Sequence, residues 1–247
     1  MFYYDPTYIF VIIGALICLA ANGYVKSTMN KFSGYRSMSG LTGAEVAGKI
    51  LRANGISDVS ITHIGGDMTD NFNPMKKTVN LSDTSYASNS VAAIAIAAHE
   101  CGHAVQHDKG YVPMKLRALI LPVANIGSML GLPMVILGVI LGGAFQYSAG
   151  DFSSQGASNI GTLLCTVGIW VFAAAVAFQI ITLPVEFNAS SRALRNLEDL
   201  GILDGIEINY GTKILRACAL TYVAAAASSI LQLLRLVLIA GGGKKRR

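Results

Sequence analysis

Four long apolar segments limit what this chain can fold into more than any other feature. They cover residues 8–25, 118–145, 160–185 and 217–240. A bilayer core requires about 20 apolar residues in helical form, so the first three segments predict transmembrane helices. The fourth either spans the bilayer or is re-entrant, because serines interrupt it and arginines lie at its edges. We therefore predict a mainly α, polytopic membrane protein with three to four transmembrane helices.

Prolines are expected to limit two of these helices. Pro122 and Pro133 interrupt the second segment and Pro184 ends the third, and proline lacks the N–H group that a helix interior needs. A new helix is then predicted to open at residue 186, within a connection over residues 186–216.

Charge content supports the same class of protein. Only 13% of the 247 residues are charged, against about a quarter in soluble domains. This composition excludes a disordered chain, a disulfide scaffold and a plain soluble enzyme. The net charge of +5 could indicate nucleic-acid binding, but the basic residues flank the apolar segments, where they set membrane orientation. We expect a lipid bilayer as partner and no nucleic acid.

Orientation follows from the basic residues between the segments. The connection 26–117 carries ten Lys and Arg residues and 186–216 carries four, whereas residues 1–7 and 146–159 carry none. Cytoplasmic connections are enriched in these residues, so both basic connections are predicted on the cytoplasmic side of the cytoplasmic membrane. The basic residues 244–247 would lie outside if the fourth segment spans.

Residues 26–117 form a polar insert that is large enough for a small α+β domain. The pattern predicts an amphipathic helix over 41–54, strands over 59–64 and 77–81, and a second helix over about 91–107. The start of the second helix is apolar on all sides, so it lies within protein or dips into lipid. Insert and membrane segments are predicted to form one domain over the whole chain.

The second of these helices contains the sequence His99-Glu100-Cys101-Gly102-His103. His99 and His103 lie one helical turn apart, so both imidazoles face the same way and can bind one Zn²⁺ ion. Glu100 lies beside the first histidine, where it can accept a proton from metal-bound water. The alternative is a helix with two structural histidines and a chance glutamate, but three of the chain's four histidines lie on this helix, which favours a metal site.

A catalytic zinc ion needs a third protein ligand. A histidine six residues after His103 would complete a metzincin site, but Lys109 occupies that position. His107 is one alternative, although three imidazoles on one straight helix converge poorly because each turn rises about 5.4 Å; we expect it to support a ligand or to lie on the surface. Glu186 is preferred, since two predicted spans separate it from His103 and bring both to one side of the membrane. Alternatively, Glu186 is only a helix-start carboxylate favoured by the helix dipole.

These residues carry a resemblance to a known family. The chain resembles the YugP-type family of membrane zinc metallopeptidases and, more distantly, the membrane gluzincins, in the stretches S-x-x-A-I-A-I-A-A-H-E-C-G-H-A-V-Q-H, G-Y-V-P and L-P-V-E-F-N-A-S-S-R-A-L. The resemblance extends over nearly the whole chain through L-T-G-A-E-V-A and T-D-x-x-x-P-x-x-K-T-V-x-L-S. It implies a zinc-dependent membrane endopeptidase in which His99, His103 and Glu186 hold zinc and Glu100 is the general base.

Several positions depart from the pattern of that family. Distant gluzincins often carry an aspartate four residues after the glutamate ligand, where this chain has Ser190, and a hydroxyl bonds a histidine less strongly than a carboxylate does. Charged residues are common in closer relatives at the positions of Asn71, Asn73 and Asn188. Ser190 and Asn188 are expected to support the metal ligands without charge, so the activity or its pH optimum can differ here.

The resemblance also indicates how a substrate binds. In this class an extended peptide pairs with an edge strand near the metal helix, and the strand with Val79 and Leu81 is the candidate. Tyr86 and Arg192 are candidate donors to the oxyanion of the transition state. The apolar start of the metal helix favours a site at the bilayer surface and a membrane-protein substrate.

Two other classes of function compete with a peptidase. A non-catalytic membrane scaffold or chaperone-like protein would retain a structural zinc site, which four protein ligands close. Only Cys101 and His107 could complete such a set of four ligands, and Cys101 points away from the face that carries His99 and His103. Cys101 is therefore expected to be a small apolar filler rather than a reactive residue. A transporter or channel is disfavoured because no span has an acid, lysine or histidine near its middle. The sequence indicates no particular oligomeric state.

Overall fold

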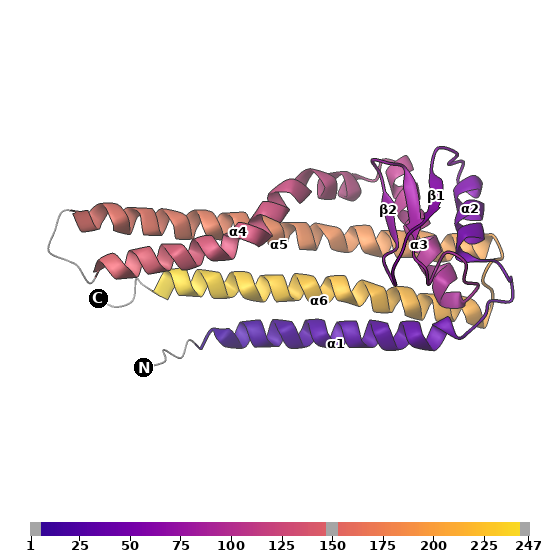
Figure 1. Ribbon diagram of the computed structural model, residues 1–247, viewed down its shortest axis with the longest axis horizontal. Coiled ribbons are helices and arrows are strands. Elements are labelled where there is room, and N and C mark those ends of the chain that lie inside the picture. The colour runs from indigo at the N-terminus through magenta and orange to yellow at the C-terminus, as the bar shows by residue number, and fades with distance from the viewer. Residues whose placement is uncertain (1–5, 147–152, 243–247) are drawn as a thin grey trace. The chain divides into compact units, whose positions relative to one another are not determined.

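The structure is a computed structural model that describes residues 6–146 and 153–242, with side chains over 6–142 and 159–240. It is mainly helical, as predicted, and contains a small three-stranded sheet (Figure 1). The elements in chain order are α1 (Tyr8–Ser33), α2 (Gly43–Ala53), β1 (Ser60–His63), β2 (Asn71–Asn73), β3 (Thr78–Leu81), α3 (Val91–Asp108), α4 (Val112–Gln146), α5 (Ser153–Asp199) and α6 (Ile206–Gly242).

In the part of the chain that the structure describes, four helices are long and apolar enough to cross a membrane. They are α1, α4 over Val112–Gly142, α5 over Asn159–Asp199 and α6 over Ile206–Ala240. Large side chains on them, such as Leu119 and Trp170, are more than 70% exposed. Contiguous apolar surface of this extent is unfavourable in water, so these faces suit lipid.

The sequence predicts that prolines interrupt or end two of the helices, but the structure shows continuous helices at these positions. α4 continues through Pro122 and Pro133, and α5 continues through Pro184. In transmembrane helices proline is tolerated because neighbouring groups and local adjustments satisfy the freed backbone atoms. The third segment and the helix predicted to open at residue 186 are therefore one helix.

The fourth apolar segment belongs to a helix that begins earlier than expected. α6 starts at Ile206, so Arg216 lies within the helix rather than at its start. The helix is continuous through residues 217–240, which supports a spanning segment over a re-entrant one. The basic residues 244–247 lie outside the described residues.

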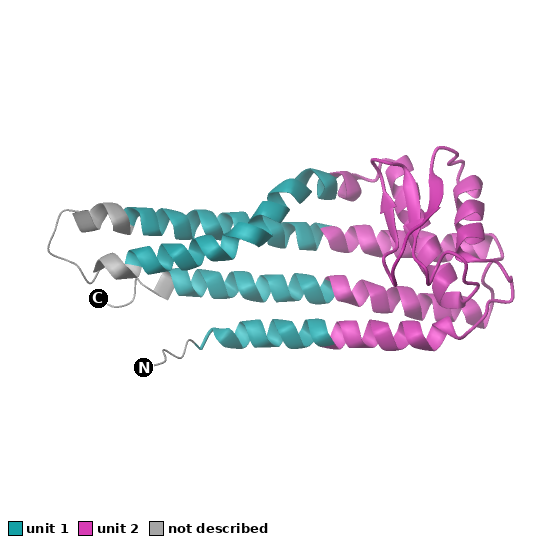
Figure 2. Cartoon of the chain, in the orientation of Figure 1, with its two compact units in different colours: residues 1–19, 116–181, 223–247 teal, residues 20–115, 182–222 magenta. Residues whose placement is uncertain are grey.

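The chain divides into two compact units (Figure 2). Unit 1 consists of residues 1–19, 116–181 and 223–247, and unit 2 of residues 20–115 and 182–222. Unit 1 contains most of the apolar segments of the four long helices. Unit 2 holds α2, the sheet, α3 and the more polar ends of the long helices.

Small residues bring α4 and α5 together within unit 1. A Cβ atom added to Gly127 would lie 2.1 Å from the carbonyl oxygen of Val171, and one added to Gly138 would lie 2.6 Å from that of Gly161. Helix association in membranes depends on such close packing, because lipid removes the hydrophobic driving force between helices. The glycines of these segments thus have a packing role.

β3 is the central strand of the sheet in unit 2. It pairs in parallel with β1 and antiparallel with β2. The strands predicted over 59–64 and 77–81 correspond to β1 and β3. The sequence does not predict β2, because Asn71-Phe72-Asn73 lies in a polar, turn-rich segment with one apolar side chain in the strand.

α3 is buried within unit 2 along most of its length. The hydroxyl of Ser90 caps its first turn by accepting from the N–H of Ala93. Val91 and Ile94 are at most 1% exposed and belong to one apolar core with α2 and β3. The apolar start of α3 therefore lies within protein, and it gives no support to a site at the bilayer surface.

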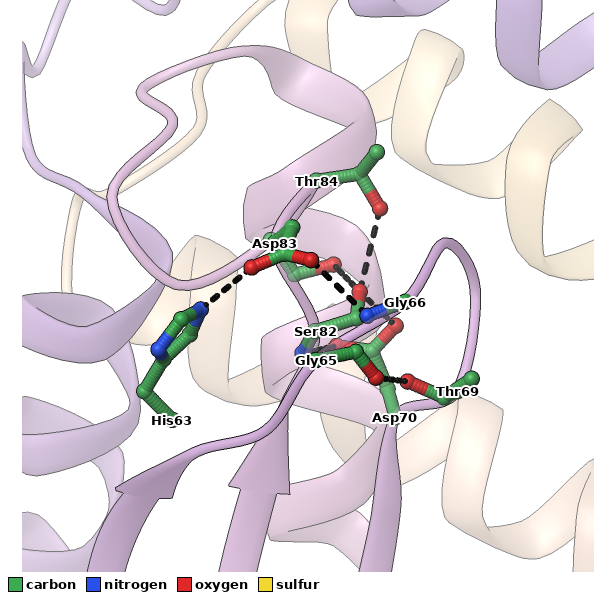
Figure 3. A network of polar contacts seen from close by, with 9 residues as sticks. His63, Gly65, Gly66, Thr69, Asp70, Ser82, Asp83 and Thr84 are labelled. Carbon is green, nitrogen blue, oxygen red and sulfur yellow. Dashed lines mark hydrogen bonds and ion pairs between the residues drawn. The ribbon is translucent and has the colours of Figure 1, made fainter.

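A polar network holds the loop between β1 and β2 against the end of β3 (Figure 3). Asp70 accepts hydrogen bonds from both the N–H (2.9 Å) and the hydroxyl (2.8 Å) of Ser82. Asp83 accepts from the N–H of Gly66 (2.8 Å) and lies 2.7 Å from Nε2 of His63. Two parts of the family pattern, Thr69-Asp70 and Leu81-Ser82, thus meet in this network. This contact indicates a structural role for both.

Replacing Asp70 with alanine is expected to destabilise unit 2. Ser82 is fully buried, so the variant would leave its N–H without the Asp70 acceptor, at a cost of about 1–3 kcal/mol. A lower thermal midpoint of the detergent-solubilised protein would report this loss. Asp67→Ala, at an exposed position of the same loop, is the control; equal midpoints for the two variants would contradict the assignment.

Candidate metal centre

Two histidines of α3 and one glutamate of α5 converge in unit 2. Nε2 of His99 lies 3.2 Å from Oε2 of Glu186, and Nε2 of His103 lies 3.4 Å from the same oxygen. All three residues are buried, and their donor atoms lie within 4.8 Å of one another. Two imidazoles and a carboxylate thus point at one small volume.

The spacing of these donors fits a tetrahedral zinc ion. Zinc binds imidazole nitrogen and carboxylate oxygen at about 2.0–2.1 Å. Two donors at that distance and at the tetrahedral angle lie about 3.3–3.4 Å apart. The distances of 3.2 and 3.4 Å from Glu186 to the two histidines match this value, and the two imidazole donors lie within 4.8 Å of each other, so the three residues fit a zinc site.

Glu186 lies in the interior of α5. The alternative that it is a helix-start carboxylate, favoured only by the helix dipole, is therefore wrong. Its side chain is 2% exposed, and burial of a carboxylate requires partners. The two imidazoles supply them.

The outer nitrogen of each histidine has its own partner. Nδ1 of His99 lies 3.2 Å from the hydroxyl of Ser190, and Nδ1 of His103 lies 3.0 Å from Oε1 of Gln106. The amide group of Gln106 donates to the carbonyl of Val185 (2.7 Å) and to Oδ1 of Asn188 (3.0 Å). Its oxygen therefore faces His103, whose Nδ1 carries the proton and whose Nε2 keeps a lone pair for a metal.

Negative charges around His103 favour its protonated form. Burial lowers the pKa of His103, but its contact with Glu186 and the charges of Glu100 and Glu186 together raise the pKa above its ordinary value. Protons therefore compete with a metal ion for this imidazole, and metal affinity should fall as the pH falls. The effect of Glu100 also indicates that its carboxylate lies near His103.

α3 and α5 approach each other closely at this site. A Cβ atom added to Gly102 would lie 2.5 Å from the carbonyl oxygen of Ala189. Cys101 faces the other way, with Sγ 3.7 Å from the carbonyl oxygen of Ala47 on α2. Burial raises the pKa of the Cys101 thiol, so this residue is an unreactive filler rather than a metal ligand.

The comparisons with known proteins agree with this geometry. A family model described as "Putative neutral zinc metallopeptidase" matches residues 7–241. The chain belongs to this family. The "Putative membrane protease YugP" of Bacillus subtilis (strain 168) is 42% identical over 231 residues, which cover 93% of this chain and 95% of that protein. No solved structure matches the chain.

The resemblance to the YugP-type family is thus confirmed, but the expected substrate-binding strand is not. Val79 and Leu81 are fully buried in β3, and β3 has a partner strand on both sides. A peptide can add only to a free edge. The edge beside the metal helix belongs to β2, where the ring of Phe72 lies 5.7 Å from that of His107.

The remaining candidate residues differ in whether they contact His99, His103 and Glu186 or their hydrogen-bond partners. His107 is exposed and packs on Phe72, and the metal-type cluster of the described residues does not include it. Arg192 donates to Oδ1 of Asn188 (2.8 Å), the residue that also binds Gln106. Tyr86 packs on His63 with ring centroids 5.1 Å apart. Ser190 and Asn188 thus contact the ligands or their partner, as expected, whereas His107 does not.

Gln106 is a site residue that the sequence analysis misses. It is fully buried and joins His103 to α5. One signal is available in the sequence, because Gln106 follows His103 by three residues and so lies on the same helical face. Its α5 partners cannot be identified without the fold.

Replacing Gly102 with alanine is expected to disrupt the candidate metal centre. The new methyl group would meet the backbone of Ala189, which cannot yield without moving α3 away from α5, and Glu186 would then separate from both histidines. Zinc affinity, measured by competition with a chromophoric chelator, should fall about tenfold or more. Gly23→Ala is the control, because a Cβ atom at that helical glycine meets nothing within 4 Å; equal affinities would contradict this role for Gly102.

Proposed function

We propose that the protein is a zinc-dependent membrane endopeptidase. His99, His103 and Glu186 would hold one zinc ion, which lowers the pKa of a bound water to about 7 and polarises the scissile carbonyl. The observation that carries this proposal is the convergence of three buried donors, with the Glu186 carboxylate at tetrahedral spacing from both imidazoles. Membership of a zinc metallopeptidase family supports it.

Glu100 is the proposed general base. It follows His99 directly on α3, is buried, and bears a charge close enough to raise the pKa of His103. From this place its carboxylate can accept the proton of the attacking water and deliver it to the leaving amine. Ser190 and Gln106 would orient the two histidines through their outer nitrogens.

We propose a gluzincin-type site on the basis of the third ligand. A glutamate from a second helix completes the two histidines, as in other zinc sites with two histidines and one glutamate. We assign the small α+β part of unit 2 to this type on the ligand set alone. Ser190 replaces the aspartate common in distant gluzincins and contributes a hydroxyl to His99.

Peptide and membrane-protein segments are the proposed substrates. The exposed edge of β2 replaces β3 as the proposed peptide-binding strand, and Arg192 and Tyr86 remain proposed donors to the oxyanion. Phe187 is 49% exposed directly after Glu186, near the end of the apolar part of α5, which supports substrates at the membrane boundary. The basic connections support a site on the cytoplasmic side of the cytoplasmic membrane.

A structural zinc site in a scaffold or chaperone-like protein has less support. Such a site requires a fourth protein ligand. Within residues 6–142 and 159–240, the metal-type cluster holds three residues. Cys101 contacts α2 and His107 is exposed, so neither closes the set. The open fourth position favours catalysis.

Metal removal tests the proposal. Treatment of the purified protein with a zinc chelator should abolish cleavage of a quenched fluorescent peptide or of a detergent-solubilised membrane protein, and added Zn²⁺ should restore it. The thermal midpoint, measured in parallel, distinguishes loss of chemistry from loss of fold. Cleavage that persists at zero zinc content would overturn the proposal.

A further inference from the structure

A pocket in unit 2 adjoins the candidate metal centre, and its two arginines have no part in the proposed hydrolysis. It has a volume of about 600 Å³ and is lined by residues of α5 and α6 together with Tyr24 of α1. Small-molecule sites have volumes of about 300–1,000 Å³. Ser190, whose hydroxyl lies 3.2 Å from His99, forms part of the wall, so an occupant would contact a residue that supports a metal ligand.

The wall of this pocket combines exposed apolar side chains with two arginines. Tyr24, Phe187 and Leu220 are 51%, 49% and 46% exposed. Arg195 and Arg216 are also exposed, and none of the ion pairs in the described part of the chain involves either of them. The pocket thus offers two guanidinium groups beside an apolar surface.

An acidic residue partly offsets these arginines. Glu198 lines the same pocket. Two arginines against one glutamate leave a net charge of +1 on the wall. The pocket therefore favours an anion over a cation.

The sequence places the pocket at a membrane boundary. Tyr24 lies at the end of the first apolar segment, Phe187 follows the third, and Leu220 lies near the start of the fourth. Aromatic residues are enriched at such boundaries, where one end of the ring is apolar and the other is wet. A molecule that fits here has an anionic head and an apolar tail.

We infer that this pocket binds an anionic phospholipid, with its phosphate group on Arg195 and Arg216 and an acyl chain along Phe187 and Leu220. Guanidinium groups bind phosphate through paired, charge-assisted hydrogen bonds. Basic pockets between transmembrane helices on the cytoplasmic side bind anionic head groups in other membrane proteins. Inorganic phosphate would use the arginines but not the apolar wall. Lipid binding of this kind does not depend on the proposed hydrolysis.

Native mass spectrometry of the purified full-length protein tests the inference. Phosphatidylglycerol should bind about tenfold or more tightly than phosphatidylcholine. The double variant Arg195→Gln/Arg216→Gln should lose this preference, and Arg52→Gln, at an exposed arginine of α2, should keep it. Glu198→Gln should strengthen phosphatidylglycerol binding, because it removes a negative charge from the wall. All four positions are exposed, and equal thermal midpoints would verify that the variants are folded.

Four results would overturn the inference. The first two are equal binding of both lipids and an unchanged preference in the double variant. The third is displacement of phosphatidylglycerol by inorganic phosphate at equal concentration, since phosphate lacks an acyl chain, and the fourth comes from cross-linking. A photoreactive phenylalanine analogue at Leu220, cross-linked in native membranes, should form a lipid adduct; adducts with polypeptide alone would assign the pocket to a protein segment instead.

Discussion

Replacing Glu100 with glutamine is expected to remove peptide cleavage while leaving the zinc content unchanged. Glutamine has nearly the same shape, so α3 and the two histidines should keep their positions, but its amide cannot accept the proton of the attacking water. General acid–base catalysis contributes about 10²- to 10⁴-fold to rates, and kcat should fall by at least this factor. Zinc is measured by atomic absorption on the sample used for the kinetics.

Asp108→Asn is the matched control for Glu100. It removes a carboxylate from the same helix at an exposed position next to Lys109, so both cleavage and zinc content should remain. Zinc with cleavage in the Glu100 variant would exclude this residue as the base. Zinc in both the wild type and the Glu100→Gln variant, with cleavage in neither, would favour the scaffold alternative.

Replacing Glu186 with glutamine is expected to weaken zinc binding and abolish cleavage together. The change removes the charged third donor and leaves two neutral imidazoles. Loss of a group that only supports a ligand lowers metal affinity by about 10- to 100-fold, so loss of a ligand should exceed this range. Competition with a chromophoric chelator measures the affinity.

A graded series around Glu186 makes this test sharper. Ser190→Ala and Gln106→Ala should each lower zinc affinity within the about 10- to 100-fold range, because they remove partners of the outer histidine nitrogens. Ser191→Ala, at an exposed position on the same helix, should have no effect. A Glu186→Gln variant that binds zinc as tightly as Ser191→Ala would contradict the assignment of Glu186 as a ligand.

The sequence predicts those features that depend on local patterns. The length of the apolar segments indicates three to four helices that can cross a membrane, and the spacing of His99 and His103 indicates a shared helical face. Glu186 is predictable because topology and family pattern agree on it. Each of these signals lies within one element or follows from counting spans.

The features that the sequence does not predict depend on contacts between elements. Pro184 suggests a helix end, but α5 continues through it because an apolar environment holds the helix together. β3 is central rather than at an edge because β2 forms in a segment without an apolar pattern. Gln106 shares a helical face with His103, but its role follows from its bonds to Val185 and Asn188 on α5.

The positions that depart from the family pattern now have definite surroundings. Asn188 accepts from both Gln106 and Arg192 through Oδ1. Asn71 accepts from the side chain of Asn80 across the β2–β3 pair, and Asn73 accepts from the backbone N–H groups of the turn that follows. Amide side chains thus fill hydrogen-bonding positions here without adding charge near the site.

X-ray absorption at the zinc edge of the purified protein tests the central claim most directly. The three-donor site predicts one zinc per chain with only nitrogen and oxygen neighbours at about 2.0–2.1 Å, and with the outer-shell scattering of two imidazoles. Glu186→Gln should lower the zinc content of the same preparation. A sulfur neighbour at about 2.3 Å, which would indicate a cysteine ligand, or a protein without zinc would contradict the claim.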